Sequence, residues 1–246
     1  MALFTRTRTN PVFYTDRLAV MLRDEPERLE RMRTEPRNVD LLTWNVFSSL
    51  DTHRDQEWLA YRLQLLGGSN LLPPVRISLF SGARRAPFLR PSTSYLDAIH
   101  RRVGEQHHTD DGVAVFEQSF EVPVRIETPD VLLLVATGRA RLRAGAGGRD
   151  RIAEIVDGGL EHARRLSSLL SVALIVDDDS DVLTSRVPDL ASRDGMRRLL
   201  PWRAEVPRAD VHGIPWSAAL RLWWEERGNL DLGGEPVKAF RSYATD

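Results

Sequence analysis

The chain contains no cysteine among its 246 residues. This absence excludes a disulfide framework, zinc sites built on thiolates and cysteine nucleophiles. Lysine is almost as rare, because Lys238 stands alone and arginine supplies the rest of the 34 basic residues. Walker A lysines, Schiff-base lysines and most other lysine-centred active sites are therefore excluded unless Lys238 supplies the amine.

Long apolar runs are missing as well. No run approaches the roughly eighteen apolar residues that a membrane-spanning helix needs, and the first residues, MALFTRTRTNPVFY, lack the apolar core of a signal peptide. We therefore expect a cytoplasmic protein with no membrane partner. The formal net charge is −1, so any binding to nucleic acid must come from a local patch of charge.

The hydrophobic fraction of 42% is enough for one large domain, with or without a small appendage. Apolar periodicity predicts helices over 15–33 (broken at Pro26), 38–50, 58–66, 95–103, 150–168 and 216–227. It predicts strands over 75–80, 113–117, 120–127, 131–142 and 170–176, and an extended piece over 201–208. This order of elements predicts an α/β or α+β domain with a central mixed sheet flanked by helices.

Local signals place the ends of several elements. Asn38 or Asp40 is suited to cap the helix over 38–50, and Ser92 or Ser94 the helix over 95–103. Thr128-Pro129-Asp130 predicts the turn between the strands over 120–127 and 131–142. Along the chain we expect an N-terminal helical segment (1–35), a core domain (36–228) and a C-terminal tail (229–246).

Three segments carry a resemblance to a known family. They are Asp40–Leu50 (DLLTWNVFSSL), Glu121–Arg139 (EVPVRIETPDVLLLVATGR) and Ile214–Leu220 (IPWSAAL). Together they resemble the PD-(D/E)XK nuclease-like proteins, which have the restriction-endonuclease fold. The first segment resembles the opening helix of that fold, the second the β-hairpin that carries its active site, and the third a helix start near the C-terminus. The match covers roughly half the chain in scattered pieces.

The resemblance implies where a catalytic site would lie. In active members, two acidic groups bind one or two Mg²⁺ ions, and a lysine helps to position the nucleophile. Here Pro123 stands at the aspartate position, Ala136 at the glutamate position and Gly138 at the lysine position. None has a side chain that binds metal or transfers a proton. The resemblance therefore implies a nuclease-like protein without its catalytic residues and without a cofactor, acting as a nucleic-acid-binding or structural component of a DNA-processing or defence system.

Two other interpretations of the sequence remain open. One is an active Mg²⁺-dependent nuclease whose carboxylates have migrated to Asp40, Glu127 and Asp130. The other is a protein-interaction module that binds a protein partner and has no role with nucleic acid.

An arginine-rich segment follows the vestigial site. Arg139, Arg141 and Arg143 alternate with small or apolar residues, which would place them on one face of the predicted strand. Arg149 and Arg151 follow after the glycine-rich run 145–148. Because guanidinium groups suit phosphate oxygens, we expect these five residues to form an exposed nucleic-acid-binding patch. The alternative is a solvated strand end beside acids such as Glu154.

Two acidic clusters are weaker candidates for metal binding. Asp177, Asp178 and Asp179 follow a buried strand, where carboxylates hold Mg²⁺ or form a turn. The other group is His107, His108, Asp110 and Asp111, which lie in one predicted loop. Neither pattern fixes a ligand set, so the sequence leaves the metal site unassigned.

Overall fold

The computed structural model describes residues 10–67, 70–81, 89–106, 120–142, 149–206 and 208–229. The chain forms two compact units. The first comprises Met1–Thr52 together with Leu220–Asp246, and the second comprises His53–Ala219. The second unit contains the sheet and all of the candidate site positions except Asp40.

The first unit begins with three helices, α1 (Thr15–Met21), α2 (Pro26–Thr34) and α3 (Val39–Leu50). The Asn38 side chain accepts a hydrogen bond from the Leu41 N–H at 3.0 Å, which confirms it as the N-cap of α3. α2 packs against α3, so the predicted boundary after residue 35 separates two helices that share a unit.

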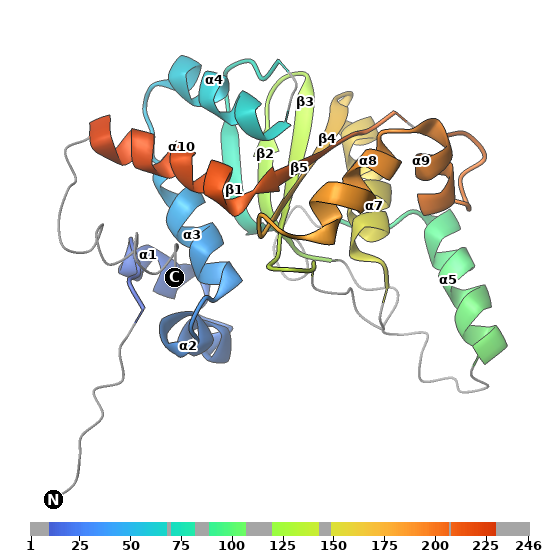
Figure 1. The fold of residues 1–246 in the computed structure, drawn as a ribbon, viewed down its shortest axis with the longest axis horizontal. Coiled ribbons are helices and arrows are strands. Elements are labelled where there is room, and N and C mark those ends of the chain that lie inside the picture. The colour runs from blue at the N-terminus through green and yellow to red at the C-terminus, as the bar shows by residue number, and fades with distance from the viewer. Residues whose placement is uncertain are drawn as a thin grey trace, which may run out of the picture. The chain divides into compact units, whose positions relative to one another are not determined.

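The second unit is built on a five-stranded sheet with the order β1-β2-β3-β4-β5 (Figure 1). Its strands are β1 (Arg76–Ser81), β2 (Val122–Glu127), β3 (Val131–Thr137), β4 (Leu169–Val176) and β5 (Asp210–Pro215). β1, β2 and β3 pair antiparallel, whereas β3, β4 and β5 pair parallel. The predicted α/β class with a central mixed sheet is therefore confirmed.

Helices accompany the sheet along the chain. They are α4 (Gln56–Gly67), α5 (Thr93–Gln106), α7 (Arg151–Leu166), a π-helical turn η3 (Val182–Arg186), α8 (Val187–Leu190), α9 (Arg193–Leu199) and the start of α10 (Trp216–Asn229). None of the helices in the described ranges is both long and apolar enough to cross a membrane.

The predicted hairpin forms the middle of the sheet. The Thr128 N–H donates to the Val131 carbonyl at 3.0 Å and closes the turn between β2 and β3. The register sets Val124 opposite Val135. The hairpin and its turn are therefore as expected, while the strand predicted over 113–117 lies outside the described residues.

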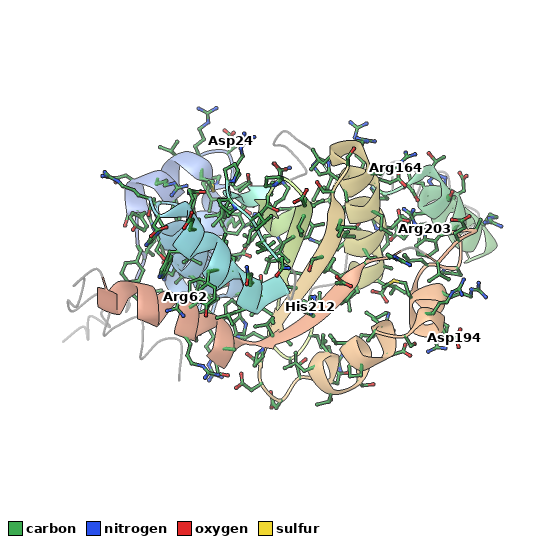
Figure 2. All side chains as sticks on the ribbon, turned by 90° about the horizontal axis from the view of Figure 1, so that it is seen from above. Asp24, Arg62, Arg164, Asp194, Arg203 and His212 are labelled. Carbon is green, nitrogen blue, oxygen red and sulfur yellow. The ribbon has the colours of Figure 1, made fainter. Side chains whose placement is uncertain are left out.

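α4 and α7 lie on opposite sides of the sheet (Figure 2). On the α7 side, a Cβ added to Gly159 would come within 2.8 Å of the Leu134 side chain and 2.9 Å of Leu170. Glycine therefore allows α7 to lie close against β3 and β4. On the α4 side, the Ser171 hydroxyl donates to the Gly67 carbonyl at 3.0 Å.

Three parts of the C-terminal third differ from the sequence prediction. β5 was not predicted, and neither were α8 and α9. Residues 201–205 contain turns and bends in place of most of the predicted extended piece. These elements are short, and each is stabilised by contacts with β4, η3 or each other rather than by its own apolar pattern.

Candidate functional site at the carboxyl edge of the sheet

The carboxyl ends of β3, β4 and β5 meet at one edge, because these strands are parallel. The start of β2 lies at the same edge, because β2 runs antiparallel to β3. Loops at the carboxyl ends of parallel strands are where open α/β sheets commonly bind ligands. The structure therefore brings Pro123, Ala136 and Gly138 to an edge of the sheet where a ligand site would be built.

Pro123 and Ala136 lie where the pairing of the hairpin strands stops. The β2–β3 ladder ends at the Val124–Val135 pair, and Pro123 and Ala136 are the next residues on the two strands. Ala136 is buried in the core cluster that also contains Leu134 and Leu174. A carboxylate at position 136 would therefore enter an apolar layer, where an unpaired charge is strongly unfavourable.

Gly138 lies where the backbone leaves no room for a side chain. It pairs with Leu142 across a tight turn, and a Cβ at this position would overlap the Arg141 carbonyl oxygen. Its N–H donates to the Ile175 carbonyl at 2.9 Å, and its carbonyl accepts from the Trp216 indole N–H at 2.8 Å. Glycine at 138 is therefore a requirement of this turn, and a lysine does not fit.

The aspartates after β4 contact the chain that follows β3. Asp177 accepts from Arg139 Nη1 at 3.0 Å. Asp178 accepts from the Ser217 N–H at 3.3 Å, at the start of α10, and Asp179 is exposed. Asp177 and Asp178 therefore connect the turn after β4 to the turn after β3 and to the start of α10. No group of three or more histidines and acids suited to a metal ion occurs among the described residues.

The prediction that the arginines after β3 lie on one face of a strand is wrong for the residues that the structure describes. β3 ends at Thr137, so Arg139 and Arg141 lie in a turn and not on the face of one strand, because the close approach at Gly138 redirects the chain. Arg143 lies outside the described residues. Arg149 is buried and pairs with the fully buried Glu154 at 2.7 Å, and Arg151 pairs with the same carboxylate at 2.7 Å.

Two of the three alternative acids, Glu127 and Asp130, lie away from this edge, and the third belongs to the other unit. Glu127 and Asp130 flank the hairpin turn at the opposite end of β2, and four residues of strand, about 13 Å, separate Glu127 from Pro123. Asp40 belongs to the first unit and pairs with Arg28 at 2.8 Å. Glu127 and Asp130 are therefore not at the carboxyl edge, and the interpretation with migrated carboxylates stays a prediction. His107, His108, Asp110 and Asp111 lie outside the described residues.

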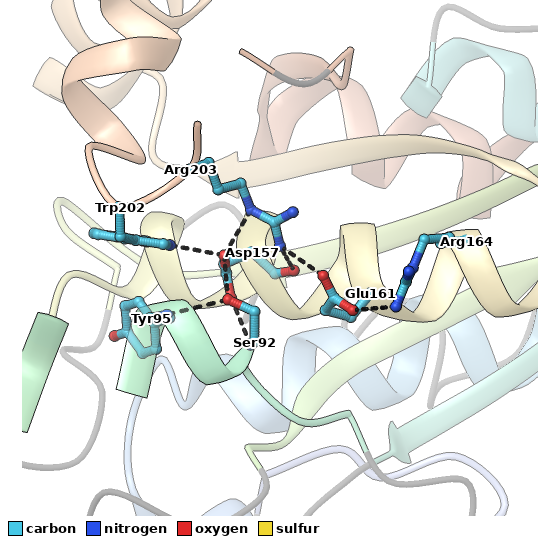
Figure 3. Close-up of polar contacts among 7 residues, drawn as sticks. All are labelled: Ser92, Tyr95, Asp157, Glu161, Arg164, Trp202 and Arg203. Atoms are coloured by element: carbon cyan, nitrogen blue, oxygen red, sulfur yellow. Dashed lines mark hydrogen bonds and ion pairs between the residues drawn. The ribbon is translucent and has the colours of Figure 1, made fainter. Parts of the chain in front are cut away.

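A buried polar centre on α7 was missed by the sequence analysis (Figure 3). Asp157 is fully buried. It accepts hydrogen bonds from Ser92 N–H (2.7 Å), the Ser92 hydroxyl (3.0 Å), Trp202 Nε1 (2.8 Å) and Arg203 Nε (2.8 Å). Ser92 also caps α5 by accepting from the Tyr95 N–H at 3.1 Å. The only signal in the sequence is a carboxylate on the apolar face of an amphipathic helix, which must find partners when buried.

Tyr95 lies beside this centre and packs edge-on against Trp202, with ring centroids 4.8 Å apart. Burial raises the pKa of the Tyr95 hydroxyl, and the neighbouring charges of Glu154 and Asp157 raise it further, against the opposing effect of Arg149. Tyr95 is therefore a neutral phenol at physiological pH. The arrangement stabilises the junction of α5, α7 and the loop after α9.

A second titratable group lies at the other end of α7. His162 is 8% exposed, and its Nε2 lies 3.8 Å from Glu127 Oε1, which also contacts Arg125 Nε at 3.1 Å. Burial lowers the pKa of His162, and the positive charge of Arg125 lowers it further, while Glu127 acts in the opposite direction. Burial likewise lowers the pKa of Arg125. His162 is therefore neutral at pH 7.

Comparisons with family models, curated proteins and solved structures find no match to the chain.

Proposed function

We propose that this protein is a non-catalytic component with a nuclease-like fold, which acts in the cytoplasm by binding within a DNA-processing or defence assembly. The observation that carries the proposal is the carboxyl edge of the sheet. Pro123 stands there beside the last pair of the β2–β3 ladder, Ala136 is buried, and the turn at Gly138 admits no side chain. Because these three residues have no metal-binding side chain, the edge supports a structural role rather than metal-dependent cleavage.

The contacts of the arginines favour a protein partner over nucleic acid. Of the predicted patch, Arg139 pairs with Asp177, while Arg149 and Arg151 pair with Glu154. A guanidinium that already neutralises a buried or half-buried carboxylate adds little to phosphate binding. Arg141 is the one exposed member of the patch among the residues that the structure describes.

Exposed apolar side chains on α4 also favour a protein partner. Tyr61 is 68% exposed and Leu65 is 62% exposed, and they lie four residues apart on one face of the helix. Leu72, shortly after α4, is also exposed. Large apolar groups gathered on a surface are typical of protein contacts.

The first experiment measures cleavage of single- and double-stranded DNA and RNA with Mg²⁺ and with Mn²⁺. We expect no cleavage above the level of a mock purification. Cleavage that stays with the protein through purification, and that is lost in Asp177→Asn or Asp130→Ala, would overturn the non-catalytic assignment.

The second experiment distinguishes a protein partner from nucleic acid. Tyr61→Ser/Leu65→Ser is compared with Leu166→Ser/Leu169→Ser, which removes exposed apolar groups at the end of α7 and the start of β4. We expect the α4 variant to lose protein partners that the parent and the control variant retain. The protein should bind a DNA duplex weakly at about 50 mM salt. Tight binding with a steep salt dependence would favour nucleic acid instead.

A further inference from the structure

A hollow of about 500 Å³ lies on the second unit, between the α8–α9 turn and the segment that leads into β5. Its lining is mixed: the side chains of Leu190, Met196, Val206 and Ala209 supply the apolar part, and Ser192, Arg193, Arg208 and Asp210 supply the polar part. The volume lies within the range of pockets that bind small molecules. The hollow is separate from the carboxyl edge of the sheet, because Asp210 on its rim begins β5 whereas the edge lies at the strand's other end.

The α8–α9 wall of this hollow is held in one shape. The Ser192 hydroxyl donates to the Asp189 carbonyl at 2.8 Å and accepts from the Gly195 N–H at 2.9 Å. A Cβ at Gly195 would overlap the Asp189 carbonyl, so the two helices approach as closely as glycine allows. Arg198 adds an ion pair with Asp189. The wall is therefore formed before any ligand arrives, which reduces the entropic cost of binding.

The charges on the rim favour an anion. Arg193 and Arg208 line the hollow and are exposed, and neither forms an ion pair with any residue that the structure describes. Nearby arginines differ in this respect, since Arg203 pairs with Asp157 and Glu161. Asp210 is the single carboxylate that lines the hollow. The lining therefore carries two positive charges and one negative charge.

We propose that this hollow binds a small carboxylic acid with an apolar body, such as an aromatic or branched-chain monocarboxylate. The apolar body contacts Leu190 and Met196, and the carboxylate accepts hydrogen bonds from the guanidinium groups of Arg193 and Arg208, whose planar geometry suits a carboxylate. Asp210 offsets one of the two positive charges, so the net charge of the lining matches that of a monoanion. The proposal is independent of the function proposed above.

The test measures binding of phenylacetate to the full chain by saturation-transfer NMR and titration calorimetry. The neutral analogue 2-phenylethanol and the dianion phenyl phosphate are measured beside it. We expect saturable binding of phenylacetate, with 2-phenylethanol about tenfold weaker or more, which corresponds to the loss of one good ionic contact. Phenyl phosphate should bind no more tightly than phenylacetate. Equal binding of the neutral analogue, or tighter binding of phenyl phosphate, would overturn the assignment to monocarboxylates.

Variants locate the site. Arg193→Ala/Arg208→Ala should weaken phenylacetate binding about tenfold or more, whereas Arg197→Ala, an exposed α9 arginine that does not line the hollow, should leave it unchanged. Ala191→Trp adds a large side chain at an exposed lining position and should abolish binding. If Arg197→Ala weakens binding as much as the double variant, or if Ala191→Trp binds like the parent, phenylacetate binds elsewhere and the proposal fails.

Discussion

Arg139 and Asp177 contact each other twice. The Arg139 guanidinium donates to the Asp177 carboxylate at 3.0 Å, and the Asp177 N–H donates to the Arg139 carbonyl at 3.2 Å. The Ser180 hydroxyl adds a bond to the Ala140 carbonyl at 2.8 Å. These contacts fix the turn after β3 to the turn after β4. An arginine expected to bind phosphate is therefore half of a pair that shapes the edge of the sheet.

The Arg139–Asp177 side-chain pair should contribute modestly to stability. Its side chains are 27% and 31% exposed, so water screens the attraction. We expect a coupling free energy of about 0.5–1 kcal/mol in a double-mutant cycle of Arg139→Ala and Asp177→Ala, measured by urea unfolding. A coupling of zero would mean that the backbone contact alone fixes the turn.

Gly138→Ala should destabilise the second unit. The added Cβ meets the backbone carbonyl of Arg141, which cannot move without opening the bridge to Leu142. We expect a loss of about 2–3 kcal/mol in the free energy of unfolding. Gly213→Ala is the matched control, because its Cβ would approach the Leu183 side chain at 2.7 Å, which can rotate away. Equal losses in the two variants would contradict the close approach at Gly138.

Asp157→Asn should be among the most damaging single-atom changes in the chain. The substitution keeps the size of the side chain but removes one of the two carboxylates that pair with Arg203, and Glu161 remains. Breaking a buried pair costs about 3–5 kcal/mol, which is the upper limit here because the Glu161 pair is retained. Asp194→Asn, on the exposed surface of α9, should leave the unfolding free energy nearly unchanged. The unfolding free energies of both variants are measured by thermal and urea unfolding. Equal values for the two variants would contradict a structural role of Asp157.

His162 should make stability depend on pH. Its pKa in the folded protein lies below the ordinary histidine value of 6.5, so between these two values the unfolded chain binds a proton that the folded chain does not. This contribution to stability is complete above pH 6.5 and declines as pH falls toward the folded pKa, with a slope of up to about 1.4 kcal/mol per pH unit. We expect the difference in unfolding free energy between the parent and His162→Gln to show this slope.

The neighbours of His162 supply the control for that prediction. The charge of Arg165 lowers the pKa of His162, and the charge of Glu127 raises it. In NMR titrations, Arg165→Ala should therefore raise the pKa of His162, while Glu127→Gln should lower it. Shifts of the same sign in both variants would contradict the electrostatic explanation.

Interactions close in sequence could be predicted without the fold. Asn38 caps α3 through a bond to a residue three positions away, and Ser92 caps α5 in the same way. The TPD turn and the apolar runs on either side of it specify the β2–β3 hairpin, because alternation and turn chemistry act over a few residues. The α/β class follows from these local signals in order along the chain.

The contacts that shape the candidate site depended on the tertiary structure. Arg139 lies 38 residues from Asp177, and Asp157 lies 46 residues from Arg203, so only the order of the strands and the packing of α7 bring these charges together. β5 is a strand because β4 offers it a ladder of hydrogen bonds, and its sequence, DVHGIP, has little apolar alternation of its own. The sequence determined those helices and strands that carry their own apolar pattern, whereas β5, α8 and α9 depend on their neighbours. The fold decided which charges are neutralised and which are exposed, since that outcome depends on distances between residues far apart in the chain.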